Sequence, residues 1–172
     1  MSSVLQGRSK NRLLFAFVFA LSNLSATADD RKALVGVWRY VAEVNTKVDG
    51  SPAPTSALSD AQGLLIYTAD GFVSVVLMPT NRGWLSETAT ISELRETVAN
   101  GTAYAGRYEM DPAAHTITHI TSVSMEPAFQ EKRLVRKYTM AGNTLKLSGT
   151  FPYEGEIIHF TITWARVVES HK

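Results

Sequence analysis

Residues 34–44 read LVGVWRYVAEV, a strand-like run that carries Gly36 and Trp38 two positions apart. A charged segment, residues 29–32, comes immediately before it. In the first strand of a small antiparallel barrel, a glycine lets the chain bend and lets other groups approach the backbone closely. An indole two residues later is large enough to close the narrow end. The stretch therefore predicts the first strand of a β-barrel, with Trp38 at its closed end.

The rest of the chain is a series of short strand-like runs separated by turn residues. Turns are indicated by Asp70-Gly71 and by Gly142-Asn143, where positive φ is readily adopted. The further strands are expected at residues 63–68, 72–78, 102–110, 116–125, 134–140, 144–148 and 157–167. Eight strands of this kind predict an all-β fold, an eight-stranded antiparallel barrel.

One short helix is expected, over residues 91–99. Thr90 and Glu93 have the spacing of a capping box, and Ile91 and Leu94 follow at helical spacing. We expect this amphipathic helix to lie across the barrel.

The first 28 residues have the composition of an export signal. Three basic residues precede an apolar run at residues 13–21, and a small-x-small site ends at Ala28. The run is shorter than the roughly 20 residues that a membrane-spanning helix needs. We therefore expect cleavage after Ala28, no stable membrane insertion afterwards, a single barrel domain over residues 29–172, and a periplasmic or secreted location. The alternative is that the segment is retained as an amphipathic anchor.

Composition excludes several classes of function. Without the three basic residues of the N-terminal segment, acidic residues outnumber basic ones, so nucleic acid is not an expected partner. The chain has no cysteine, which excludes disulfides, thiol nucleophiles and zinc–thiolate sites. No phosphate-binding glycine loop or dinucleotide fingerprint is present, and we expect no cofactor. The sequence leaves the oligomeric state open.

Several stretches, in their order and spacing, resemble the lipocalin-like domain family of small bacterial and fungal proteins. They are LVGVW at 34–38, GLLIYTADG at 63–71, YAGRY at 104–108, TH at 118–119, PAF at 127–129, VRKY at 135–138, GNTLKL at 142–147 and WAR at 164–166. The resemblance implies a lipocalin-type barrel in which Arg166, on the last strand, lies over Trp38. Similar proteins often carry a cysteine where this chain has Ala105 and a second histidine where it has Ile120. Barrels of this shape serve both as carriers and as enzymes.

Alternate side chains of a barrel strand point inward, and this defines a candidate interior. The expected inner residues are Tyr104, Gly106, Tyr108 and Met110; Ile117, His119, Thr121 and Val123; Leu134, Arg136, Tyr138 and Met140; and Phe160, Ile162, Trp164 and Arg166. The interior is thus mostly apolar with a few polar groups, which is typical of small-molecule sites.

The candidate ligand-binding residues are Tyr104, Tyr108, His119, Arg136, Tyr138 and, from a loop, Trp84. An interior arginine requires a partner, so Arg136 indicates either a protein group, such as Glu109 or a tyrosine hydroxyl, or a ligand carboxylate.

His119 has three interpretations: a hydrogen-bonded core residue, a general acid–base, or a haem ligand. His115 lies four residues earlier, about 13 Å away along a strand, so we expect no metal site.

The leading hypothesis is an exported barrel that binds a small apolar or amphipathic molecule. The alternative is an isomerase, cyclase or dehydratase in which His119 or Tyr104 transfers protons and Arg136 stabilises negative charge. A third hypothesis is a stress or envelope protein whose barrel is fully packed with side chains.

Overall fold

The computed structural model describes residues 30–53, 58, 60–80, 82, 86–99 and 101–168. The chain divides into two units at Leu34–Val35, and each is described by itself. In the first unit residues 30–34 are helical. The expected signal segment and Trp84 lie outside the described residues.

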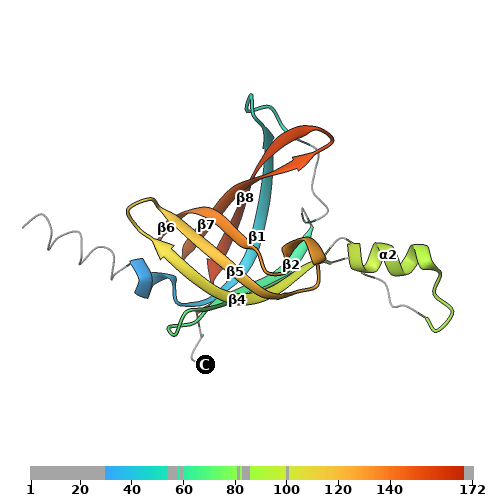
Figure 1. Ribbon diagram of the computed structural model, residues 1–172, viewed down its shortest axis with the longest axis horizontal. Coiled ribbons are helices and arrows are strands. Elements are labelled where there is room, and N and C mark those ends of the chain that lie inside the picture. The colour runs from blue at the N-terminus through green and yellow to red at the C-terminus, as the bar shows by residue number, and fades with distance from the viewer. Residues whose placement is uncertain are drawn as a thin grey trace, which may run out of the picture. The chain divides into compact units, whose positions relative to one another are not determined.

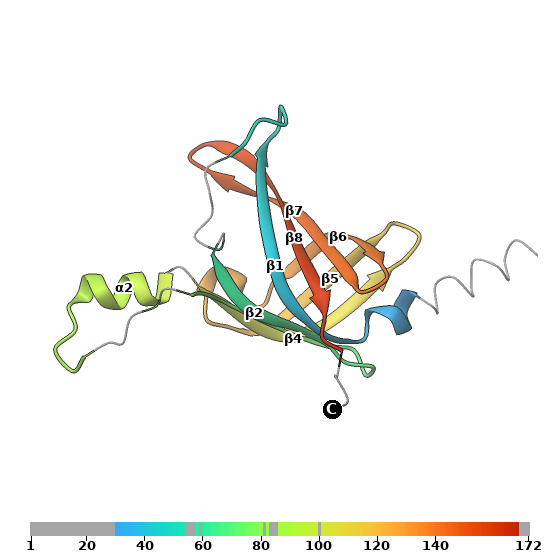
Figure 2. The same cartoon turned by 180° about the vertical axis from the view of Figure 1, so that it is seen from behind.

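The second unit is a closed barrel of eight antiparallel strands joined in chain order (Figure 1). The strands are β1 (Gly36–Lys47), β2 (Ala61–Tyr67), β3 (Phe72–Pro79), β4 (Thr102–Asp111), β5 (Thr116–Ser124), β6 (Arg133–Ala141), β7 (Thr144–Tyr153) and β8 (Glu156–Arg166). Strand β1 pairs with β2 on one side and with β8 on the other, which closes the barrel. From behind, β1 is seen crossing the barrel between β2 and β8 (Figure 2). The predicted fold class is confirmed.

The described residues of this unit form two short helices, α2 (Ile91–Ala99) and the 3-10 helix η1 (Pro127–Phe129). The capping box of α2 is formed, because the Thr90 amide donates to the Glu93 carboxylate at 2.7 Å and the Glu93 amide donates to the Thr90 hydroxyl at 3.3 Å. The expectation that α2 packs on the barrel is wrong for its first turn. Ile91 and Leu94 are exposed, so neither side chain is buried against the barrel.

Trp38 is fully buried at the end of the barrel where β1 begins and β8 ends. The guanidinium of Arg166 lies 4.1 Å from the centre of the indole and donates a hydrogen bond to the Val35 carbonyl at 2.9 Å. Gly36 has φ +141°, and a β-carbon there would collide with the Arg166 guanidinium. The glycine therefore makes room for the arginine that covers the tryptophan.

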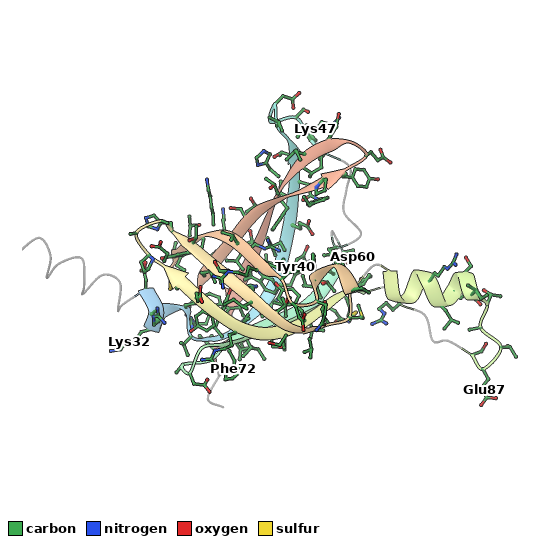
Figure 3. All side chains as sticks on the ribbon, in the orientation of Figure 1. Lys32, Tyr40, Lys47, Asp60, Phe72 and Glu87 are labelled. Atoms are coloured by element: carbon green, nitrogen blue, oxygen red, sulfur yellow. The ribbon has the colours of Figure 1, made fainter. Side chains whose placement is uncertain are left out.

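The opposite end of the barrel contains the end of β1 and the start of β2. In Figure 3, Lys47, at the end of β1, and Phe72, at the start of β3, lie toward opposite ends, with Tyr40 between them. Strand β7 reaches Tyr153, five residues further than predicted, and its last residues pair with the start of β8 at the Lys47 end.

Two register shifts change which side chains face inward. Between β4 and β5 the shift follows Ala105, and Gly106 packs so closely on the Ile120 carbonyl that no β-carbon fits. The prediction that Val123 faces inward is wrong, because this bulge moves it to the outer face, where it is 61% exposed. In β1 the shift between Tyr40 and Ala42 brings Glu43 to the interior.

Candidate functional site

The barrel interior is hollow toward the Lys47 end. The cavity has a volume of about 490 Å³. Its lining is mostly apolar and includes Val75, Leu77, Phe129, Leu134, Leu147, Phe151, Phe160, Ile162 and Trp164. The polar residues of the lining are Glu43, Thr102, Tyr104, His119, Glu126, Arg136 and Thr150. The cavity contradicts the hypothesis of a fully packed barrel and has the size of a small-molecule site.

Arg136, on β6, lies in this lining as predicted. Its guanidinium stacks over the Phe160 ring, 5.0 Å from the centre, and donates a hydrogen bond to the neighbouring Val135 carbonyl at 3.2 Å. Gly149, on β7, pairs with Phe160 on β8, and its missing side chain leaves the space that the Phe160 ring occupies. The side chain is therefore held by an aromatic face and one backbone oxygen.

Arg136 forms no ion pair with any described carboxylate, including Glu43 and Glu126 in the same cavity. The predicted partner Glu109 is wrong, because Glu109 points outward and pairs with Arg133 at 2.6 Å. Burial lowers the pKa of Arg136, and the nearby hydroxyls of Tyr104 and Tyr67 partly oppose this. A cation that no described carboxylate neutralises, in a mostly apolar chamber, favours an anionic or electron-rich ligand.

His119, on β5, is 1% exposed and is hydrogen-bonded on both sides. Its Nε2 lies 2.6 Å from the Tyr67 hydroxyl, and its Nδ1 lies 2.8 Å from the Tyr104 hydroxyl. Burial, with a smaller contribution from the Arg136 charge, lowers the pKa of His119 to about 3. The imidazole is therefore neutral at physiological pH and acts as a fixed hydrogen-bonding bridge.

Tyr104, on β4, joins this bridge to the cavity. Burial raises the pKa of its hydroxyl to about 12, with the Arg136 charge acting weakly in the opposite direction. Its ring meets the edge of Phe129, which η1 brings over the cavity. The Thr121 hydroxyl holds η1 in place by bonding to the Phe129 carbonyl and accepting the Lys132 amide at 2.9 Å.

The remaining predicted tyrosines are buried outside the cavity lining. Tyr108 donates its hydroxyl to the Thr68 carbonyl at 3.0 Å and packs its ring against Tyr67. Tyr138 is buried with its ring 5.8 Å from that of His115. Of the predicted ligand-binding residues, the structure therefore brings Tyr104, His119 and Arg136 together in the cavity.

Sequence reasoning did not identify Tyr67, Glu43 or Glu126 as polar groups of this site, and it placed Trp164 inward without giving its indole N–H a role. Tyr67 has the same strand parity as the buried Leu65, and that alternation could have found it. The Trp164 side chain lines the cavity, and its buried Nε1 has no hydrogen-bond partner among the described residues. Glu43 is inward only because of the bulge in β1, and Glu126 lies outside any strand, so periodicity reveals neither.

Within the described ranges, no cluster of three or more His, Asp or Glu side chains could hold a metal ion. No helix in the described part of the chain has the length and apolar character needed to cross a membrane.

An up-and-down barrel of eight strands, closed by a tryptophan–arginine pair and hollow at the other end, defines the lipocalin-like class of protein. The family model described as a lipocalin-like domain matches residues 35–167, so the chain belongs to that family. No curated protein matches the sequence significantly.

Proposed function

We propose that this protein binds one small apolar or amphipathic molecule inside its barrel. The apolar lining would hold the hydrocarbon part of the molecule, while Tyr104, His119 and Arg136 would surround its polar end. The family membership supports small-molecule binding in general, and the arrangement of the cavity supports this amphipathic ligand in particular.

The observation that carries this proposal is the position of Arg136. A charged guanidinium in a mostly apolar chamber is costly unless an anion or water compensates it. Because no described carboxylate pairs with Arg136, a ligand bearing negative charge would gain a charge-assisted hydrogen bond there. Phe160 and the Val135 carbonyl hold the side chain but do not neutralise its charge.

Native mass spectrometry of the protein purified from its own host tests the proposal. We expect a retained small-molecule mass that is released on denaturation. The variant Arg136→Met should retain less of it, whereas Arg133→Met, which removes an exposed arginine from the outer face of the same strand, should retain as much as the wild type. If the protein carries no molecule and none of a panel of apolar acids binds to it, the proposal is wrong.

The hydrogen bond between His119 and Tyr104 supports a second candidate, an isomerase, cyclase or dehydratase that moves a proton on the bound molecule. An efficient acid–base group has a pKa near the working pH. Burial takes the pKa of His119 down to about 3 and that of Tyr104 up to about 12, which favours binding over proton transfer. Conversion of a retained molecule by the wild type but not by Tyr104→Phe would reverse this preference.

We also propose that the protein acts in the periplasm or outside the cell. The basic, apolar and small-residue segments of residues 1–28 support export and cleavage after Ala28. The mass of the mature protein isolated from its host tests this, because a chain that still contains residues 1–28 would contradict cleavage.

A further inference from the structure

The two hydrogen bonds of His119 decide whether the cavity offers a donor or an acceptor to a ligand at its inner wall, the part of the lining around Tyr104, His119 and Arg136. A neutral imidazole has one N–H and one bare nitrogen, so one of the two flanking hydroxyls donates to it and the other accepts from it. The hydroxyl that accepts keeps its own hydrogen for another partner. The question is whether that hydroxyl belongs to Tyr67 or to Tyr104.

Tyr67 cannot use a spare hydrogen. It is 1% exposed and is not part of the cavity lining, and its hydroxyl has no hydrogen-bond partner other than His119 among the described residues. A buried donor without an acceptor is unfavourable. Tyr67 therefore donates to Nε2, and Nδ1 carries the proton.

Tyr104 accepts that Nδ1 proton and is left with a free O–H. Its side chain lines the cavity, where a ligand can accept this hydrogen. The Arg136 guanidinium, which can only donate, lines the same cavity. Near His119 the cavity therefore offers donors from Tyr104 and Arg136, and the Arg136 charge acts on both Tyr104 and His119. The carboxylates of the same lining belong to Glu43 and Glu126.

We infer that the inner end of the cavity binds the carboxylate of an apolar acid, and that Tyr67, which does not touch the ligand, positions the donors by fixing the His119 tautomer. One carboxylate accepts several hydrogen bonds and carries the single negative charge that one arginine balances. An ammonium group, which only donates, would find charged acceptors at Glu43 and Glu126 and none at the Arg136 guanidinium. The inference rests on the proposed function and adds the class of the ligand's polar end.

The tautomer is measured first, without any ligand. In the nitrogen NMR spectrum of the wild-type protein, we expect the His119 proton on Nδ1. In Tyr67→Phe, Nε2 loses its donor, so the proton should be distributed between the two nitrogens. A wild-type protein with the proton on Nε2 would overturn the inference, as would an unchanged tautomer in Tyr67→Phe.

The ligand preference is then measured by displacement of anilinonaphthalene sulfonate with decanoate, methyl decanoate, decanol and decylamine, which share one hydrocarbon chain. The wild type should prefer decanoate over the other three by roughly tenfold or more, the effect of a hydrogen bond to a charged group. Tyr67→Phe should reduce this preference about two- to tenfold. The double variant that combines Tyr67→Phe with Tyr104→Phe should lose no more of the preference for decanoate than Tyr104→Phe alone, because both substitutions act through the Tyr104 hydroxyl.

Tyr108→Phe is the matched control, since its hydroxyl is bonded to the Thr68 carbonyl outside the cavity lining. It should leave both the preference and the tautomer unchanged. If all four probes bind equally, or decylamine binds best, the inference is wrong and the proposed binding function stands. If none displaces the dye from any variant, the proposed function fails and the inference fails with it.

Discussion

The Arg166 guanidinium lies 4.1 Å from the centre of the Trp38 ring and donates to the Val35 carbonyl at 2.9 Å, so the last strand holds the start of the first. The arrangement predicts that this pair closes the barrel. Removal of the buried indole in Trp38→Ala should cost about 3–5 kcal/mol. For a chain of this size we expect Tm to fall by roughly 10 °C, measured by circular dichroism.

A second pair provides a matched control for the arginine. Arg107 lies 4.7 Å from the centre of the exposed Phe72 ring on the outer surface. Arg166→Met should lower the free energy of unfolding by about 1–3 kcal/mol, and Arg107→Met by less than about 0.5 kcal/mol, because only the former leaves buried groups unsatisfied. A Trp38→Ala protein with unchanged stability and no ligand binding would assign the pair to the site instead of closure.

Arg136→Met should make the ligand-free protein more stable while it weakens binding. The substitution removes a desolvated charge and keeps an unbranched side chain against Phe160. We expect a gain of about 1 kcal/mol in urea unfolding, because replacing a buried charge by an apolar group is often stabilising. Arg133→Met, on the outer face, should lose at most about 1 kcal/mol. A loss of several kcal/mol in Arg136→Met would show that the arginine has a structural role.

Tyr108→Phe should lower stability and leave binding unchanged, in contrast to Arg136→Met. The hydroxyl donates to the Thr68 carbonyl, where β2 turns toward β3, and its loss should cost about 1 kcal/mol of stability. Ligand affinity should stay at the wild-type value, since Tyr108 does not line the cavity. The sequence predicted Tyr108 as a ligand-binding residue, and a large loss of affinity with little change in urea midpoint would support that prediction.

Most of the fold follows from alternation along the strands and from the turn residues between them. Inward positions on β6 and β8 were predicted because each strand keeps one register along its length, and side-chain parity then persists. The prediction for Val123 was wrong because the alternation of inward and outward side chains reverses at the bulge between β4 and β5. Gly106 was a visible sign of that bulge, since a glycine inside a strand often marks close backbone approach.

The chemistry of the site was less accessible to sequence reasoning. Parity identified Tyr104, His119 and Arg136 as inward, but it says nothing about depth, which separates them from Tyr108 and Tyr138. The bridge from Tyr67 to Tyr104 depends on three side chains from β2, β4 and β5 meeting at one level of the barrel. The stagger between neighbouring strands sets that level, and the alternation of residues within one strand carries no information about the stagger.

The buried His119 predicts acid sensitivity. Its pKa in the folded protein is lowered to about 3, whereas an unfolded histidine titrates near pH 6.5, so the unfolded chain binds more protons between these values. The stabilising contribution is therefore complete above about pH 6.5 and is lost as the pH falls toward 3, by up to about 1.4 kcal/mol per pH unit. Burial raises the pKa of both flanking tyrosines, Tyr67 and Tyr104, so neither titrates in this window.

The variant His119→Gln should be less stable than the wild type near pH 7, because glutamine cannot bridge both tyrosines with the same geometry. Its stability should fall less steeply on acidification, since the group that must be protonated on unfolding is gone. Urea unfolding of both proteins between about pH 7 and about pH 4 measures the two slopes. His159→Gln, at an exposed position of β8, should keep the wild-type slope. Equal slopes for His119→Gln and the wild type would show that His119 is not the group responsible.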